Sequence, residues 1–403
     1  MGLRRAAAIF GALAPALLLA CSSRERPLGL SDGYEDTGRV GADVWDPGFD
    51  VGAADASFNC SDGKDAGVCA CNEIGQKPTS LYVVLDRSGS MSERETATGP
   101  TKWDVITLAL LHAKTGVLRR LGSRISVGLG LFPGPVKGTD ACTTGDEFFP
   151  LTPGSPATYD KIVEVLRFQT PYGGTPSAAT LSALAPKIKA LPQPAFVLFA
   201  TDGAPNCANA PCGPDRCAYN LEGQIAPGGR ACDATFNCCD PALVPSGGGW
   251  RVCVDADATK AAIADLAAAG VKTFVFGAPG LGPYTSDLNE LAKAGGTARE
   301  DAKPGEPLYY SATAITQDSF VAALSAVAAK VIDSCVITLE KVPDDRGITN
   351  VLVDGVLVPQ DPVDGWAWTP DGKVELRGAT CAKVKAGDVV NVKVAVGCRT
   401  VTK

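Results

Sequence analysis

The sequence contains a single histidine, His112, and this scarcity argues against several classes of enzyme. A zinc protease of the His-Glu-x-x-His type needs two histidines, and a serine hydrolase needs a histidine beside its nucleophile. His112 follows Leu108 and Val105 at helical spacing, on an apolar face of a predicted helix. We therefore interpret His112 as a structural residue and expect that the protein is not an enzyme.

Basic clusters are also absent, and the formal net charge is −7 at pH 7. Because nucleic acids attract basic surfaces, this balance argues against nucleic acid as a partner. Apolar residues make up 45% of the chain and charged residues 20%, which is typical of a folded globular protein.

The apolar run near the N-terminus is shorter than a typical transmembrane helix, and its surroundings have the layout of a secretory signal peptide. Two arginines precede a short apolar run that ends at Ala20, so we assign residues 1–20 to the signal. The sequence Leu-Leu-Ala-Cys ending at Cys21 resembles the bacterial lipobox, whose cysteine becomes acylated. An ordinary signal peptide with a nearby cysteine is the alternative. The resemblance implies a lipid-anchored envelope protein, and Ser22 favours the outer membrane of a Gram-negative bacterium.

The rest of the chain divides into a linker and folded parts. Residues 21–58 are rich in Gly and Asp, which predicts a flexible tether. Their aspartates lack the spacing of a calcium-binding EF-hand loop. Residues 59–79 form a cysteine-containing lead-in, and residues 335–403 alternate apolar and polar positions around Asp-Gly pairs, which predicts a small antiparallel β module.

Residues 80–334 alternate apolar runs with helical patterns, which predicts an α/β domain with a mainly parallel sheet. The expected strands are 81–85, 125–132, 195–200, 271–277 and 308–311, with an antiparallel edge strand at 147–151. The expected helices are 102–121, 158–168, 176–190, 256–269, 286–294 and 316–333. The last helix has an apolar stripe at Phe320, Leu324, Val327 and Val331.

Oxygen-bearing side chains occur at the end of the predicted sheet where its parallel strands finish. They are Asp86, Ser88, Ser90, Thr175 and Asp202. Taken singly, the two serines and Thr175 could cap helices, and Asp202 could belong to a simple turn. Taken together, two carboxylates and three hydroxyls at one end of a sheet suit a small octahedral divalent cation.

The stretch Asp-Arg-Ser-Gly-Ser-Met, which begins at Asp86, resembles the signature of the von Willebrand factor type A (vWA) family. Thr175 and the Thr-Asp-Gly around Asp202 match the later parts of that family's metal-ion-dependent adhesion site. The resemblance implies a Rossmann-like, mainly parallel six-stranded sheet with helices on both faces. It also implies Mg²⁺ or Mn²⁺ as the cofactor, with Ser88, Ser90 and Thr175 as direct ligands and the two aspartates acting largely through water.

In the family, an Asp or Glu carboxylate of a partner completes the metal's coordination. We therefore expect this domain to bind a protein or another acidic ligand, and the alternative is a metal-independent envelope scaffold. The family also couples binding to movement of its last helix, here residues 316–333.

The remaining cysteines fall into two groups if the fold is an α/β sheet. The first group lies on loops beside the predicted metal site and comprises Cys142, Cys207, Cys212, Cys217, Cys232, Cys238, Cys239 and Cys253. The second group lies at the opposite end and comprises Cys60, Cys69, Cys71, Cys335, Cys381 and Cys398.

Seven cysteines of the first group belong to an insertion, residues 203–254. Export favours disulfides over zinc for these cysteines. We expect one bridge between Cys142 and the insertion, different partners for Cys238 and Cys239, and one bridge between the N-terminal lead-in and the β module. The insertion is predicted to select the partner.

Overall fold

The computed structural model describes residues 72–74, 77–135, 141–226, 228–244, 250–331, 335–386 and 392–403. The predictions for the signal peptide, Cys21, the tether and Cys60, Cys69 and Cys71 lie outside these residues. Within them, no helix combines the length and the hydropathy needed to cross a membrane.

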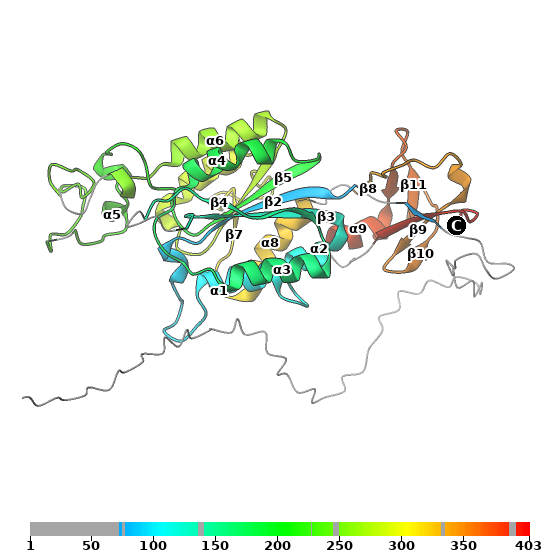
Figure 1. The fold of residues 1–403 in the computed structure, drawn as a ribbon, viewed down its shortest axis with the longest axis horizontal. Helices are drawn as coiled ribbons and strands as arrows, with labels where there is room; N and C mark the ends of the chain where they lie inside the picture. Colours follow the sequence, from blue (N-terminus) through cyan, green and yellow to red (C-terminus); the bar gives the residue numbers. More distant parts are fainter. Residues whose placement is uncertain are drawn as a thin grey trace, which may run out of the picture. The chain divides into compact units, whose positions relative to one another are not determined.

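A six-stranded sheet forms the centre of the larger domain (Figure 1). Its strands, in spatial order, are β4 (Asp146–Pro153), β3 (Ile125–Phe132), β2 (Thr79–Asp86), β5 (Ala195–Thr201), β6 (Lys272–Gly277) and β7 (Tyr310–Ser311). All neighbours pair in parallel except β3 and β4, which are antiparallel. The mainly parallel sheet and its antiparallel edge strand are therefore as predicted.

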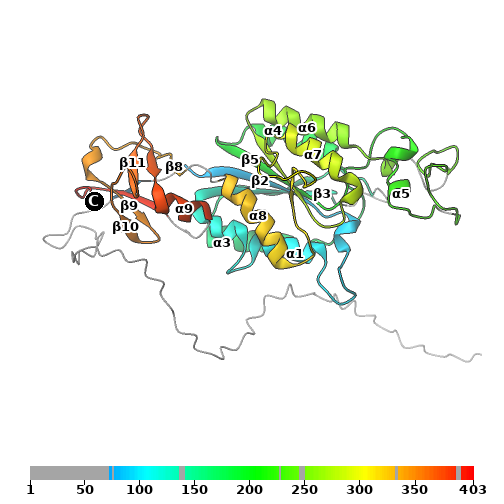
Figure 2. The ribbon, with the colours of Figure 1, turned by 180° about the vertical axis from the view of Figure 1, so that it is seen from behind.

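Helices cover both faces of this sheet, as Figures 1 and 2 show. One face packs against α1 (Lys102–Leu111), α2 (Val117–Leu121), α3 (Pro156–Arg167) and α8 (Gln317–Val331). The other face packs against α4 (Ser177–Lys189), α6 (Ala256–Ala268) and α7 (Thr285–Ala294).

The sequence of strand β2 is almost continuously apolar because both of its faces are buried. Leu81, Val83 and Leu85 belong to the hydrophobic cluster on one face, whereas Tyr82 and Val84 belong to the cluster on the other. A central strand buried on both faces requires apolar residues at every position. The apolar stripe of α8 is buried as predicted, with each of its four residues at most 4% exposed.

One helix prediction was wrong in part, because residues 102–121 form two helices rather than one. Helix α1 ends at Leu111, and His112, which was placed inside the helix, is its C-terminal cap with an extended backbone. The His112 Nδ1 atom lies 2.9 Å from the Thr115 hydroxyl and accepts a hydrogen bond from the Thr115 backbone N–H at 3.3 Å. This local bonding favours a turn over continued helix, and it gives His112 a structural role at a partly exposed position.

The C-terminal β module contains two antiparallel sheets around Trp366, which is fully buried. One sheet has the order β1 (Asn72–Ile74), β13 (Val392–Val396), β9 (Thr349–Val353) and β10 (Val356–Val358), and the other has β11 (Trp366–Trp368), β12 (Val374–Leu376) and β8 (Val336–Ile337). The predicted Asp354-Gly355 turn joins β9 to β10, with φ of 50° and 83° at its two residues. The lead-in strand β1, strand β11 and helix α9 (Gly378–Ala386) were not predicted.

Candidate metal centre

The ends of β2 and β5 lie side by side and bring two of the predicted segments together. Leu85 of β2 pairs with Ala200 of β5, so Asp86 and Asp202 emerge at the same end of the sheet. A short 3₁₀ turn, Gly89–Ser92, follows β2 and carries Ser90. The Ser90 hydroxyl donates to Asp202 Oδ1 at 2.7 Å, and the Ser88 and Ser90 hydroxyl oxygens are 3.1 Å apart. Residues 112 positions apart in the chain therefore share one polar cluster.

Asp86 is the most deeply buried acid of this cluster, with none of its surface exposed. Its Oδ1 accepts from the Ser88 backbone N–H at 2.7 Å, and its Oδ2 accepts from the Thr201 hydroxyl at 2.6 Å. Burial, followed by the charge of Asp202, raises the pKa of Asp86 to about 7. Burial also raises the pKa of Asp202, although Lys102 opposes that rise. Two buried acids are thus held near each other, and Lys102 compensates the charge of Asp202 only in part.

Thr175 comes from the loop before α4 and is 3% exposed. Its backbone N–H donates to Asn206 Oδ1 at 2.7 Å, and its carbonyl accepts from the Asn206 N–H at 2.9 Å. A Cβ atom added to Gly203 would lie 3.8 Å from Ser90 Oγ and 3.9 Å from Thr175 Oγ1. The hydroxyls of Ser90 and Thr175 therefore border a small space beside Gly203.

The capping roles that the sequence left open for Ser88 and Thr175 are not used. Ser88 precedes the 3₁₀ turn, but its side chain makes no capping hydrogen bond. Helix α4 starts at Ser177 with Pro176 at its N-cap, again without a side-chain cap, so Thr175 does not take the alternative role of N-cap. These hydroxyls are consequently not committed to helix ends.

Lys102, which the sequence did not single out, lies at the edge of the same cluster. Its Nζ donates to Asp202 Oδ2 at 3.0 Å and to Glu93 Oε2 at 2.7 Å, and its side chain is only 3% exposed. Burial alone would lower the pKa of Lys102, but the two carboxylates outweigh it and raise the pKa. Its position at the start of α1, after the Thr101 cap, was the only sequence signal available.

The donor set fits a divalent metal ion. It combines two buried carboxylates with three hydroxyls, two of which border the space beside Gly203. Hard oxygen donors of this kind suit Mg²⁺ or Mn²⁺. Asp86, Ser88, Ser90, Thr175 and Asp202 would hold the ion. A metal bound largely through neutral hydroxyls would retain positive charge for an incoming anionic group.

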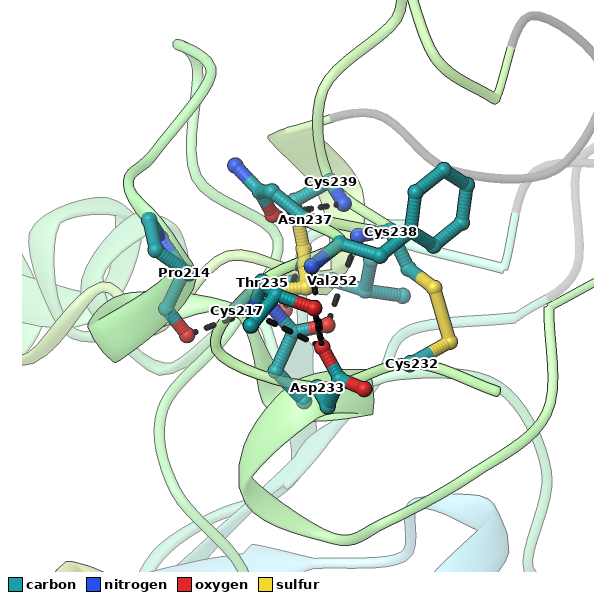
Figure 3. Close-up of a disulfide and its surroundings, with 11 residues drawn as sticks. Pro214, Cys217, Cys232, Asp233, Thr235, Asn237, Cys238, Cys239 and Val252 are labelled. Carbon is teal, nitrogen blue, oxygen red and sulfur yellow. Dashed lines mark hydrogen bonds between the residues drawn. A yellow bond between two sulfur atoms is a disulfide. The ribbon is translucent and has the colours of Figure 1, made fainter. Parts of the chain in front are cut away.

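The insertion lies at the same end of the sheet and is held together by disulfides. The predicted bridge from Cys142 is confirmed as Cys142–Cys207, with a Cα separation of 5.7 Å. Cys238 and Cys239 have different partners, as predicted, namely Cys232 and Cys217 (Figure 3). Cys212 pairs with Cys253.

The sulfurs of Cys212, Cys239 and Cys253 lie within 4.8 Å of one another, but all three are disulfide-bonded. They offer no thiolates, so disulfides rather than zinc organise the insertion. The insertion's short helix α5 (Ala218–Leu221) and the buried Phe236 pack among these bridges.

At the other end of the domain, Cys335 pairs with Cys381, and Cys398 is also disulfide-bonded. The predicted bridge between the lead-in and the β module involves Cys60, Cys69 or Cys71, which lie outside the described residues, and it stays a prediction.

Glu222 of the insertion accepts a hydrogen bond from the Tyr284 hydroxyl at 3.1 Å, and the charges of Glu93, Asp202 and Lys102 affect its pKa. Desolvation raises the pKa of Glu222, as do the charges of Glu93 and Asp202, whereas the hydrogen bond from Tyr284 and the charge of Lys102 oppose this rise.

Neither family models nor curated proteins match this sequence. Among solved structures, the chain is similar to the pilus adhesin SpaC from Lactobacillus rhamnosus GG, at 16% identity and a TM-score of 0.42, over 80% of this chain and 40% of SpaC. It is similar to the PilB minor pilin from Streptococcus sanguinis, at 18% identity and a TM-score of 0.40, over 64% of this chain and 62% of PilB. It is also similar to the manganese-loaded TRAP protein from Plasmodium vivax, at 17% identity and a TM-score of 0.34, over 64% of this chain and 76% of TRAP.

The chain thus spans less than two thirds of the adhesin and the pilin. The strand order and the two helical layers form a Rossmann-like fold. This is the arrangement of sheet and helices that the vWA resemblance implied.

Proposed function

We propose that this protein is an exported, lipid-anchored envelope protein whose vWA-type domain binds an acidic group of a protein ligand through a divalent metal ion. Mg²⁺ or Mn²⁺ would be held by Asp86, Ser88, Ser90, Thr175 and Asp202. The observation that carries this proposal is the convergence of two buried carboxylates with hydroxyls that cap no helix. A ligand carboxylate would complete the metal's coordination.

The proposal assigns binding and no catalysis. A hydrolase would need a base beside Ser88 or Ser90, and the neighbours of these hydroxyls are each other and Asp202. The imidazole of His112 is engaged with Thr115 in the turn after α1. The disulfide-bonded insertion, which contacts Thr175 through Asn206, is the region that would select the partner.

The first test measures whether the protein binds a divalent metal ion. Isothermal titration of the purified full-length protein with Mn²⁺ and with Mg²⁺ should show one site, and Asp86→Ala should abolish it. Asp344→Ala removes an exposed carboxylate of the β module and should leave binding unchanged. An Asp86→Ala variant that is folded and binds Mn²⁺ like the wild type would refute the metal site.

The second test separates adhesion from the scaffold alternative. Partner capture from envelope or matrix extract should occur in Mg²⁺ and fail both in EDTA and with the Asp86→Ala variant. A metal-independent scaffold would capture the same partners in all three conditions, and that result would favour the alternative.

A further inference from the structure

The loop that carries Thr175 is held between three other segments by backbone hydrogen bonds. Gly173 accepts from the Gly89 N–H at 3.0 Å, which ties the loop to the turn after β2. Gly174 donates to the Ala141 carbonyl at 2.8 Å, which ties it to the segment between β3 and β4. Thr175 exchanges two hydrogen bonds with Asn206, one through the Asn206 side chain at 2.7 Å and one through its backbone at 2.9 Å. The hydroxyl of Thr175 therefore depends on contacts outside its own element.

The Cys142–Cys207 disulfide joins two of those three segments covalently. Cys142 directly follows Ala141, and Cys207 directly follows Asn206. The bridge therefore links the two segments whose residues Ala141 and Asn206 bond to the Thr175 loop. A Cβ atom on Gly174 would lie 2.8 Å from Cys207 Sγ and 3.4 Å from Cys142 Sγ. The bridge thus packs directly against the loop, at a distance that only glycine permits.

The backbone at Cys207 is itself constrained. Its φ is 66°, in the left-handed region that residues other than glycine seldom adopt, and its N–H donates to the Arg251 carbonyl at 2.8 Å. Such conformations persist where the surroundings enforce them, often at functional sites. The other described disulfides differ from Cys142–Cys207, because three lie wholly within the insertion and Cys335–Cys381 lies in the β module.

We infer that Asn206 and the Cys142–Cys207 disulfide are positioning residues of the metal centre, which hold the Thr175 hydroxyl in place for the ion. This inference rests on the proposed function. It makes the insertion more than a partner-selecting surface, since its first residues support a ligand of the metal directly.

Three variants test the inference. Asn206→Ala removes the acceptor for the Thr175 N–H, whereas Asn206→Asp retains an acceptor at the same position. The double variant Cys142→Ser with Cys207→Ser opens the bridge. Loss of an outer-shell partner typically weakens metal binding by about 10–100-fold, and we expect a loss of at least about tenfold in Mn²⁺ affinity for Asn206→Ala and for the double variant. Asn206→Asp should restore most of the affinity.

Matched controls come from the same insertion. Asn237→Ala removes an asparagine whose side chain bonds to Cys212 and Cys239, and Cys232→Ser with Cys238→Ser opens a bridge that does not touch the Thr175 loop. Both should retain wild-type Mn²⁺ affinity. Thermal unfolding without metal is measured alongside, since a purely structural role would lower the Tm of the test and control variants alike and leave their affinities equal.

The outcomes separate this inference from the proposed function. If the wild-type protein binds neither Mn²⁺ nor Mg²⁺, the proposed function fails and the inference fails with it. If the wild type binds Mn²⁺ and Asn206→Ala binds it equally well, only the inference is overturned. Asn206→Ala decides the matter if the double variant does not fold.

Discussion

Lys102 brings a fixed positive charge to the proposed metal centre. Its ammonium group is buried between Asp202 and Glu93, at 3.0 and 2.7 Å from their oxygens. In the absence of metal this charge partly offsets the repulsion between Asp86 and Asp202. Once a dication binds, the same charge opposes it, because like charges a few ångströms apart repel strongly in a buried site. Lys102 is therefore expected to stabilise the metal-free protein and to limit metal affinity.

The Lys102→Met variant tests both expectations. Methionine retains an unbranched side chain but removes the charge, so the metal-free protein should lose about 3 kcal/mol of unfolding free energy, as expected when one partner of a buried ion pair is removed. Mn²⁺ affinity, measured by titration calorimetry, should rise by about tenfold, since one repelling charge is gone.

Lys187→Met is the matched control, because it breaks a half-exposed pair with Glu147. Exposed salt bridges contribute little to protein stability, so the stability and Mn²⁺ affinity of Lys187→Met should stay near those of the wild type. Weaker Mn²⁺ binding by Lys102→Met would show that Lys102 orients Asp202 for the metal rather than competing with it.

Among the elements, those fixed by local patterns were predicted from the sequence. The apolar stripe of α8, the edge strand β4 and the Asp354-Gly355 hairpin each follow from periodicity or turn chemistry within a few residues. Strand β1 was missed, because three residues gain their structure only by pairing with β13 more than three hundred residues later. The break at His112 was missed because a helical apolar pattern continues on both of its sides.

The proposed metal centre also combines residues that the sequence predicted with residues that it did not. Its five candidate oxygen donors follow a motif that the sequence displays, whereas Lys102 and Asn206 enter it through contacts with residues 100 and 31 positions away. Charge and hydrogen-bond partners at such separations depend on the final packing, and no local pattern in the sequence encodes them.

Helix α8 illustrates how much one buried side chain contributes to the stability of the fold. Phe320 is fully buried, and its ring lies 5.4 Å from that of Phe276 in β6. Phe320→Ala should reduce the free energy of unfolding by about 3–5 kcal/mol, because it removes a large buried side chain and leaves a cavity. Urea unfolding of the purified protein measures this change. Phe168→Ala is the matched control, since Phe168 is 70% exposed and its loss should change stability little. Equal effects of the two variants would contradict the packing of α8 described here.

At the scale of the whole molecule, both ends of the folded part meet in the β module. Strand β1, which precedes the sheet of the larger domain, pairs with β13 near the C-terminus, and Ile74 packs against the module's core. The larger domain is therefore connected to the module by chain segments at both its start and its end. We propose that the tether, residues 21–58, leads from this folded part to the membrane.

Cys21 is predicted to carry a lipid anchor. Acylation with two or more chains holds a protein to a bilayer stably, so the full-length protein should fractionate with membranes and incorporate a labelled fatty acid in growing cells. Cys21→Ala should lose the label and move to the soluble exported fraction, while it keeps wild-type Mn²⁺ affinity because the metal centre does not involve the anchor. Ser22→Ala, which leaves the acylated cysteine in place, is the control and should stay labelled. A Cys21→Ala protein that remains with washed membranes would show that another part of the chain provides the attachment.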